Sequence, residues 1–263
     1  MNIAIIGYGK MGKLIETHAL KRGHQAAAIV DPFVHEETAG PSGAPFYRTI
    51  ADASGLDASD AAIEFTRPDT APDNMLALIE RRIPLVVGTT GWLDRMEEIR
   101  LAVEAAGTSL VWAPNFSLGV NLFYRIAAYA AHLADPFPEY DVGGWEAHHN
   151  RKADSPSGTA KTLVEGVLAQ MSRKTAPVWE TLDRPPKAGE LHYPSLRVGS
   201  VPGVHTLIFD SPADTIEITH SARNREGFAA GAIRAAEWLA GGPGPRRGVF
   251  TMDDVLAEIL KED

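Results

Sequence analysis

The sequence predicts an α/β protein with two domains, one built on a parallel sheet and one of α+β type with a mixed or antiparallel sheet. In the first half of the chain, short β-branched apolar runs alternate with helical patterns, which is typical of a parallel sheet covered by helices on both faces. From residue 142 onward the apolar runs are longer and fewer helices separate them, which favours mixed or antiparallel pairing.

The predicted elements follow from these patterns in order. We expect strands over residues 2–6, 26–30, 61–65, 85–87 and 109–112, with helices after the first strand and over 71–81 and 93–106. In the second half we expect strands over 142–149, 195–199, 204–210 and 215–220, a loop with three prolines over 181–194, and a helix after 155–157. A helical pattern resumes after residue 220, and a Gly/Pro-rich loop over 241–248 leads to a last helix over 252–260.

Length and composition limit the classes of function. The chain has 263 residues, of which 44% are hydrophobic, and this is enough for a sizeable core. Its net charge of −9 argues against a general nucleic-acid or anionic-membrane surface. No cysteine is present, which excludes disulfides, thiolate nucleophiles and Cys-ligated zinc. No signal peptide or membrane-spanning run is recognisable, so we expect a cytoplasmic protein.

A glycine motif lies between the first predicted strand and the first predicted helix. Gly7, Gly9 and Gly12 form G-x-G-x-x-G. The first glycine permits a tight turn, the second lets the backbone approach a pyrophosphate, and the third allows close helix–strand packing. Asp31 ends the second strand about 20 residues later, where a ribose-binding acid is expected. This order predicts a Rossmann-type dinucleotide site, and the alternative is a plain βα turn followed by a solvated aspartate.

Asp31 also bears on the choice of dinucleotide. A carboxylate accepts hydrogen bonds from a ribose 2′-OH and repels a 2′-phosphate. Pro32 follows it at a position where an arginine would favour NADP. The sequence therefore favours NADH over NADPH, although Lys10, Lys13 or Arg48 could supply the missing positive charge. In the alternative, Asp31 only caps a turn with Pro32.

Two loops follow the predicted strands over 85–87 and 109–112. They read G-T-T-G at 88–91 and A-P-N-F at 113–116. Ligands of doubly wound sheets bind at the carboxyl ends of strands, so the hydroxyl and amide groups in these loops could contact ribose and nicotinamide. Taken singly, each loop is also compatible with ordinary turn chemistry.

Cations gather before a helix start in the second half. Residues 148–152 read H-H-N-R-K, and S-P-S-G-T follows at 155–159. Ser155-Pro156-Ser157 is a helix-start signal, so the amides near Gly158 and Thr159 lie at a helix N-terminus, which suits a carboxylate. The histidines, Arg151 and Lys152 beside it predict a pocket for a small polyanion, in which a histidine or lysine can deliver a proton.

The alternative interpretation of this segment is a solvated basic loop with one core histidine. No metal is expected, because a third good ligand at suitable spacing is lacking. A serine hydrolase is excluded because no G-x-S-x-G elbow is present.

The segment 146–160, E-A-H-H-N-R-K-A-D-S-P-S-G-T-A, resembles the signature of the 4-hydroxy-tetrahydrodipicolinate (dihydrodipicolinate) reductase family of lysine biosynthesis. The resemblance runs over most of the chain. It includes G-Y-G-K-M-G at 7–12, E-F-T-R-P at 64–68, V-G-T-T-G at 87–91, A-P-N-F-S-L-G-V-N at 113–121, V-G-S-V-P-G-V-H-T at 198–206 and H-S-A-R-N-R-E-G-F-A-A-G-A at 220–232. The central signature is highly specific, whereas the glycine motif alone is weak.

The resemblance implies NADH- or NADPH-dependent reduction of 4-hydroxy-tetrahydrodipicolinate to tetrahydrodipicolinate. It implies that His148 donates or accepts a proton, that Lys152 donates a proton, and that His149, Gly158 and Thr159 bind substrate. The implied cofactor-contacting residues are Gly7, Tyr8, Gly9, Lys10, Met11, Gly12, Asp31, Gly88, Thr89, Thr90, Ala113, Pro114, Asn115 and Phe116.

The resemblance also implies an assignment of domains and an assembly. Residues 1–117 with 222–263 are expected to bind the dinucleotide, and 118–221 to bind a small dicarboxylate and to assemble a homotetramer. No nucleic-acid or membrane partner is expected. Three other classes stay open: a different two-domain Rossmann dehydrogenase, such as an amino-acid or aspartate-type enzyme, a nucleotide-binding sensor without catalysis, and a structural α/β protein.

Overall fold

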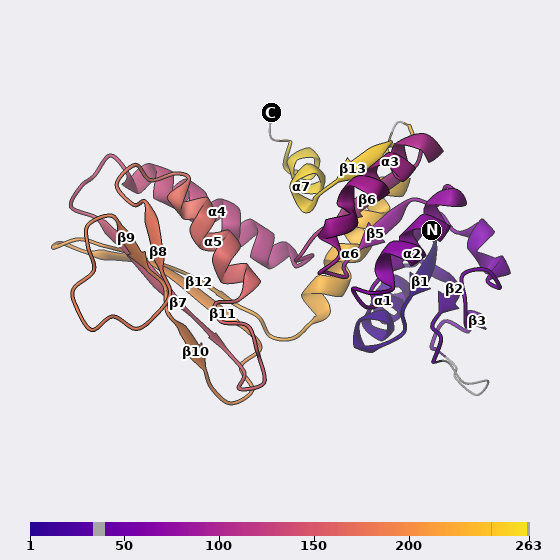
Figure 1. Ribbon diagram of the computed structural model, residues 1–263, viewed down its shortest axis with the longest axis horizontal. Helices are drawn as coiled ribbons and strands as arrows, with labels where there is room; N and C mark the ends of the chain where they lie inside the picture. Colours follow the sequence, from indigo (N-terminus) through magenta and orange to yellow (C-terminus); the bar gives the residue numbers. More distant parts are fainter. Residues whose placement is uncertain (34–39, 243, 262–263) are drawn as a thin grey trace. The chain divides into compact units, whose positions relative to one another are not determined.

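The chain divides into two compact units in a computed structural model that describes residues 1–33, 40–242 and 244–261 (Figure 1). Unit 1 comprises Met1–Leu118 and Arg225–Asp263, and unit 2 comprises Gly119–Asn224. Each unit has its own hydrophobic core, because the core clusters of one unit contain no residues of the other among those described.

Unit 1 is built on a seven-stranded sheet in which every neighbouring pair of strands is parallel. Its strands are β1 (Asn2–Ile6), β2 (Gln25–Val30), β3 (Phe46–Tyr47), β4 (Ala61–Glu64), β5 (Leu85–Val87), β6 (Ser109–Trp112) and β13 (Gly248–Phe250). They lie in the order β13-β6-β5-β4-β1-β2-β3. The order 3-2-1-4-5-6 within this sheet is that of the dinucleotide-binding doubly wound fold. The predicted fold class is confirmed for this unit.

Helices cover both faces of this sheet because its strands are apolar on both sides (Figure 1). They are α1 (Lys10–Lys21), α2 (Ala71–Glu80), α3 (Met96–Ala106), α6 (Glu226–Ala240) and α7 (Met252–Leu260), with 3-10 turns η1 (Ser54–Ala58) and η2 (Leu93–Arg95). Ile3 and Ile5 of β1 pack with residues of α1, α6 and α7, whereas Ala4 and Ile6 pack with residues of α2 and α3. This alternation is the period of two that a strand imposes.

Unit 2 contains the predicted mixed sheet, in the order β10-β7-β11-β12. Its strands are β7 (Asp141–His148), β10 (Ser195–Arg197), β11 (Val204–Asp210) and β12 (Thr215–Ser221). β10 runs parallel to β7, and β11 is antiparallel to both β7 and β12. Helices α4 (Leu118–Ala134) and α5 (Gly158–Leu168) share one core with this sheet, which includes Phe123, Leu163 and Leu207 (Figure 1).

Several short elements differ from the sequence-based expectation. The loop predicted over 181–194 contains β9 (Glu190–His192), which pairs with β8 (Ala176–Val178). The loop predicted over 241–248 ends where β13 begins, and β13 pairs with β6. Residue 243 of this loop lies outside the described residues. Strands of two or three residues carry no readable alternation, and their position is set by the partner strand.

Helix α4 was not predicted, although it has 17 residues. Its apolar residues lie on several sides of the helix: Phe123 and Ala127 are buried, whereas Leu122, Ile126 and Tyr129 are exposed. A helix without a single apolar stripe gives a weak periodic signal. No helix in the described part of the chain is long and apolar enough to cross a membrane.

Candidate active site

The glycine turn of unit 1 is shaped by contacts that only glycine permits at two of its three positions. Gly7 has φ +88°, and a Cβ on it would overlap the carbonyl oxygen of Phe65. A Cβ on Gly12 would overlap the carbonyl oxygen of Gly7. These two glycines therefore fix the approach of β1 to α1, as the sequence predicts for a tight βα turn.

Gly9 is different, because a Cβ built on it meets no protein atom within 4 Å. It is the N-cap residue of α1 and has negative φ, so nothing in the protein requires glycine there. Open space beside the first amides of a helix is the arrangement that a pyrophosphate occupies in dinucleotide-binding turns. The residues present therefore fit a dinucleotide. Lys10, the first residue of α1, is exposed at this end of the helix.

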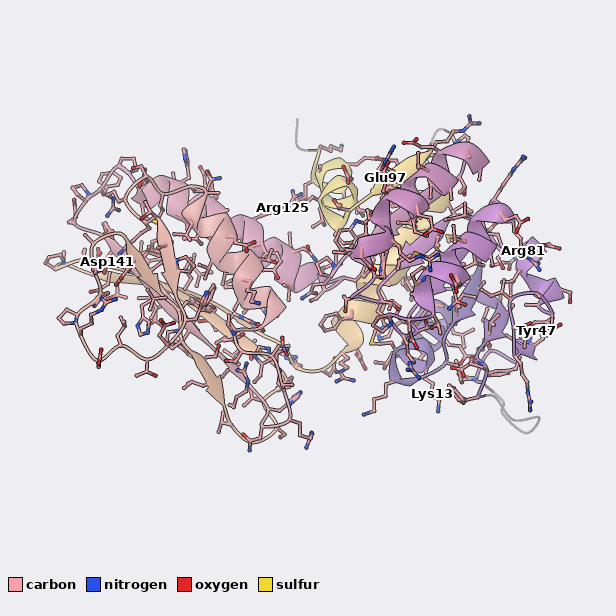
Figure 2. All side chains as sticks on the ribbon, in the orientation of Figure 1. Lys13, Tyr47, Arg81, Glu97, Arg125 and Asp141 are labelled. Carbon is pink, nitrogen blue, oxygen red and sulfur yellow. The ribbon has the colours of Figure 1, made fainter. Side chains whose placement is uncertain are left out.

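Asp31 and Tyr8 are tied to each other at the end of β2. Asp31 Oδ2 accepts the amide of Tyr8 at 2.6 Å, and Oδ1 accepts the amide of Phe33 at 2.9 Å. The Tyr8 hydroxyl donates to the buried carboxylate of Glu16, and Lys13, labelled in Figure 2, places Nζ 5.7 Å from the centre of the Tyr8 ring. Burial and the neighbouring Glu16 raise the pKa of Tyr8 well above its usual range.

The loops after β5 and β6 are held in place by side-chain hydrogen bonds. Thr89 is buried, and its hydroxyl accepts the amide of Thr66 at 2.8 Å, which ties the end of β5 to the end of β4. Its carbonyl oxygen accepts Trp92 Nε1 at 2.8 Å. Asn115 Oδ1 accepts the amide of Ser117 at 2.9 Å. Thr90 and Pro114 are exposed next to these fixed residues.

A cavity of about 210 Å³ lies at the carboxyl end of this sheet within unit 1. Five of the predicted cofactor-contacting residues line it, namely Met11, Gly88, Ala113, Pro114 and Phe116. The other lining residues, Phe65, Arg225 and Phe228, were not predicted. Arg225 is the N-cap residue of α6, so a segment more than 100 residues distant along the chain adds a cation to the wall of this cavity.

In unit 2, the basic segment lies between the end of β7 and the start of α5, as predicted. Ser157 is the N-cap residue of α5, and its hydroxyl accepts the amide of Ala160 at 3.0 Å. The same residue donates its amide, at 2.9 Å, and its hydroxyl to the carboxylate of Glu146. Glu146 therefore links the end of strand β7 to the first turn of α5.

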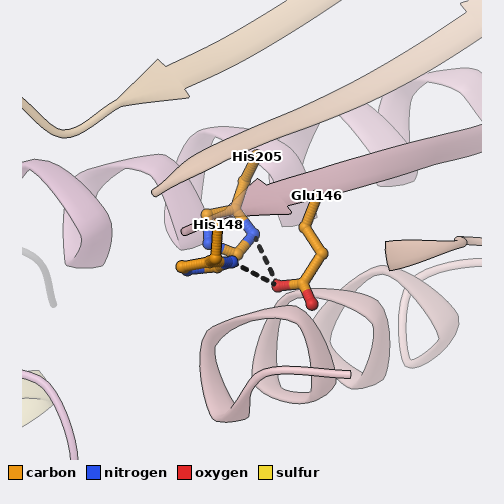
Figure 3. Close-up of side chains that lie close together, drawn as sticks. All are labelled: Glu146, His148 and His205. Carbon is orange, nitrogen blue, oxygen red and sulfur yellow. Dashed lines mark ion pairs between the residues drawn. The ribbon is translucent and has the colours of Figure 1, made fainter. Parts of the chain in front are cut away.

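His148 and His205 face the carboxylate of Glu146 (Figure 3). The Nδ1 atoms of His148 and His205 lie 3.4 Å and 3.8 Å from the same oxygen, Oε2 of Glu146. The two rings meet edge to face at 5.2 Å between centroids. All three side chains are buried, and that of Glu146 is 0% exposed. His205 comes from β11, whose residue 205 pairs with residue 146 of β7.

Three charged side chains surround this cluster. Lys152 Nζ lies 2.8 Å from the carboxylate of Asp154. Arg197, on β10, places Nη2 3.3 Å from Oε1 of Glu146 and 2.5 Å from the carbonyl oxygen of Asp154. Arg197 was not among the predicted site residues, because it is 45 positions beyond Lys152 in the sequence and enters through the pairing of β10 with β7.

The predicted substrate-binding residues lie around the start of α5. His149 directly follows β7, with its Nδ1 buried, and Gly158 begins the helix with open space around its Cα. The Thr159 hydroxyl hydrogen-bonds the phenol of Tyr124, whose pKa is raised to about 12 by burial. The fold thus brings together the five residues predicted for catalysis and substrate binding within one β7–loop–α5 segment.

The protonation states of the cluster follow from burial and charge. Burial raises the pKa of Glu146, but the hydrogen bonds from Ser157 and Ser195 together outweigh burial. The pKa therefore lies below its usual range, and the carboxylate is ionised. Burial lowers the pKa of His148; the charge of Glu146 opposes this, and the charges of Lys152 and Arg197 add to it. Burial lowers the pKa of His205 to about 4.

The prediction that a third metal ligand is lacking was wrong, because three side chains with ligand atoms lie close together. The fold brings one atom each of Glu146, His148 and His205 within 4.8 Å of one another. However, Glu146 Oε2 already accepts the Ser157 hydroxyl, and a guanidinium lies on its other oxygen. This donor set suits a proton between buried groups better than a divalent cation. The absence of a bound metal stays a prediction.

The fold and these two sites define a class: two-domain oxidoreductases with a Rossmann-type dinucleotide unit. Family models described as "Dihydrodipicolinate reductase, N-terminus" and "Dihydrodipicolinate reductase, C-terminus" match residues 1–116 and 119–256. The chain belongs to the dihydrodipicolinate reductase family.

Individual relatives agree with the family assignment. The chain is 37% identical to the 4-hydroxy-tetrahydrodipicolinate reductase of Christiangramia forsetii, with 99% of this chain and 100% of the relative covered. It is 38% identical to the enzyme of the same name from Chromobacterium violaceum, with 97% and 98% covered. Among solved structures, a dipicolinate-bound dihydrodipicolinate reductase from Paenisporosarcina sp. TG-14 shares the fold, with a TM-score of 0.75, 18% identity, and 95% and 97% covered.

Proposed function

We propose that this protein reduces 4-hydroxy-tetrahydrodipicolinate to tetrahydrodipicolinate with a reduced nicotinamide dinucleotide, a step of lysine and diaminopimelate biosynthesis. The observation that carries the proposal is the segment from Glu146 to α5, where His148, Lys152 and a helix N-terminus lie together in a protein of this family. A dicarboxylate requires positive groups held locally, because the whole chain is acidic.

Each group of this segment has a role in the proposed reaction. The amides of Gly158 and Thr159 bind a substrate carboxylate at the start of α5, together with His149. Lys152, paired with Asp154, delivers a proton to the ring carbon adjacent to the one that is reduced. His148 acts as acid or stabilises the negative charge that develops on the ring. In total the substrate gains one hydride and one proton, and its 4-hydroxyl group leaves as water.

The dinucleotide is assigned to unit 1, the domain predicted over 1–117 with 222–263. When bound, it supplies the hydride. Gly7 to Gly12 hold its pyrophosphate, and the residues lining the 210 Å³ cavity, with Thr89, Thr90 and Asn115, contact its nicotinamide half. NADH is favoured over NADPH because Asp31 directly follows β2 and Pro32 comes next.

Assembly and location complete the proposal. Unit 2, the domain predicted over 118–221, binds the small dicarboxylate and assembles a homotetramer. β12 is an edge strand of its sheet, and an edge leaves backbone groups for pairing with another chain. We place the enzyme in the cytoplasm, where no cysteine pairing is needed for stability.

The test is a coupled assay in which a synthase makes the unstable substrate in place, with NADH and NADPH run in parallel. Oxidation of either dinucleotide that depends on the synthase product supports the proposal. Turnover of keto or imino acids instead would assign the protein to another dehydrogenase group. Binding of NADH without turnover of any acid would assign it to nucleotide sensing.

A further inference from the structure

We propose that Glu146 is the positioning residue of this site: its Oε2 holds His148 with a proton on Nδ1 and leaves Nε2 to act on the substrate. The inference rests on the proposed function, because it gives His148 a partner in the same proton transfer. Glu146 does not reach the substrate pocket itself, since its side chain is 0% exposed.

The orientation of His148 follows from what its ring nitrogens face. Nδ1 lies 3.4 Å from an oxygen of an ionised carboxylate, which can only accept a proton. The tautomer that places hydrogen on Nδ1 is therefore favoured, and Nε2 is the atom that gains or releases the second proton. The distance is longer than an ordinary hydrogen bond, and such contacts commonly shorten when substrate binds.

Glu146 is itself fixed by donors from two other elements, the start of α5 and β10. It accepts hydrogen bonds from the amide and hydroxyl of Ser157, at the start of α5. From β10 it accepts the Ser195 hydroxyl at 2.7 Å and Nη2 of Arg197 at 3.3 Å. A carboxylate held by this many donors has little freedom to turn away from His148. The same contacts couple the histidine to the helix N-terminus that is proposed to hold a substrate carboxylate.

The opposite edge of the His148 ring, with Nε2, lies against Gly203. A Cβ built on Gly203 would lie 3.1 Å from Nε2 of His148 and 3.4 Å from Cδ2. Any larger residue at 203 would therefore cover the atom that the proposal assigns to proton transfer. The φ angle of Gly203 is +156°.

His205 competes for the same oxygen but does not take the proton. It is more deeply buried than His148, with 3% against 8% exposed. The groups that face it are Glu146, His148, His220 and Lys152, and burial outweighs the charge of Glu146 in lowering its pKa. His148 faces Glu146, His205, Lys152, Arg197 and Asp154. Of the two histidines, His148 is therefore the one that takes up a second proton more readily.

The experiment compares Glu146→Gln, Glu146→Asp and the wild type in the coupled assay over a range of pH. The anion of Glu146 raises the pKa of His148, so its removal lowers that pKa. If protonated His148 is the active form, the limb in which kcat falls with rising pH moves to lower pH in Glu146→Gln, by on the order of one unit. We expect kcat to fall on the order of 100-fold with KM for NADH unchanged.

Glu146→Asp keeps the charge but withdraws the carboxylate by one methylene. This variant is expected to have a lower kcat than the wild type. The pH range in which its kcat falls with rising pH should be the same as in the wild type. Glu190→Gln is the matched control, because it removes an ion-paired carboxylate of the same unit whose partner, at 2.8 Å, is Arg184 rather than His148 or His205. The control should keep both the rate and the pH limb.

Several outcomes would overturn the inference. An unshifted limb in Glu146→Gln, wild-type kcat in Glu146→Asp, or equal losses of turnover and NADH binding would each leave Glu146 with a merely structural role. If Glu146→Gln does not fold, Glu146→Asp decides alone. Loss of wild-type turnover on dialysis against a chelator, with recovery on adding zinc, would assign the cluster to a metal instead. An inactive wild type would refute the proposed function, which is a separate result.

Discussion

Asp31 illustrates how the local contacts of one side chain bear on ligand choice. Its oxygens accept the amides of Tyr8 and Phe33, so the turn-capping interpretation of this residue describes contacts that exist. A carboxylate has about four acceptor positions, and two amides leave room for ribose hydroxyls. The two interpretations of Asp31 are therefore compatible, and the capping contacts hold the carboxylate beside the glycine turn.

The proposed site could be predicted in part because several of its residues are contiguous. His148, Lys152 and the start of α5 lie within one short stretch. Arg197 and His205 could not be found in this way, because they reach the cluster through the pairing of β10 and β11 with β7. Glu146 did leave a signal: residues 146 and 148 are two apart on a strand, so they share one face.

Replacement of Lys152 tests its role as proton donor. We expect Lys152→Ala to lower kcat far more than it weakens NADH binding, by on the order of 100-fold in kcat, because proton delivery is lost while unit 1 is untouched. Steady-state kinetics and NADH fluorescence titration measure the two effects. Lys161→Ala, an exposed lysine on α5, is the control and should behave as wild type. Equal losses in turnover and binding would refute the role.

His205 should make the stability of the protein depend on pH. Its pKa is lowered to about 4, mainly by burial. The charge of Glu146 raises this pKa, and the charges of His148, His220 and Lys152 lower it. The unfolded chain then binds more protons than the folded chain between about pH 6.5 and 4, so stability falls as pH falls through this window. In His205→Gln the free energy of unfolding, measured by denaturant titration, should fall less over this window. A slope equal to that of the wild type would contradict this.

Among the elements, those with a clear periodic or apolar pattern could be predicted, whereas the long helix α4 and several strands of two or three residues could not. The helices over 71–81 and 252–260 and the strands over 204–210 and 215–220 differ from the observed elements by no more than one residue at either end. β3, β8, β9 and β13 have two or three residues each, and their conformation depends on neighbouring strands rather than on their own sequence. The chain direction is nonetheless predictable, because parallel strands need helical crossovers.

The glycine turn allows stability and ligand binding to be separated. Gly12→Ala should lower Tm, because its Cβ meets the carbonyl oxygen of Gly7. Gly9→Ala should keep the Tm of the wild type, because no protein atom lies within 4 Å of its Cβ. If a pyrophosphate occupies that space, Gly9→Ala should weaken NADH binding on the order of 10-fold or more, through steric overlap.

Thermal melts followed by circular dichroism and NADH titrations check both variants. Gly166→Ala on α5 is a suitable control, since its Cβ also meets nothing within 4 Å. It should leave NADH binding unchanged and slightly raise Tm, because alanine is the better helix former. Unaltered NADH affinity in Gly9→Ala would argue against the pyrophosphate position.

On the scale of the whole molecule, two separate cores predict that each ligand protects one unit. NADH should slow amide hydrogen exchange around residues 7–12 and 88–90 of unit 1, and pyridine-2,6-dicarboxylate, as a substrate-like probe, around residues 148–160 of unit 2. A ligand at 100 times its Kd stabilises its own unit by about 2.7 kcal/mol. Exchange measured by mass spectrometry resolves these segments. Protection by NADH confined to unit 2 would contradict the assignment of units.

The division of the chain has a consequence for how the protein is made. Unit 1 needs α6 and β13, which are encoded after the whole of unit 2. While a ribosome is still translating the final part, β6 has no neighbour on its outer edge and the Arg225 side of the cavity does not exist. The inserted unit can therefore fold first, and the nucleotide-binding half reaches its native form only after nearly all of the polypeptide has emerged.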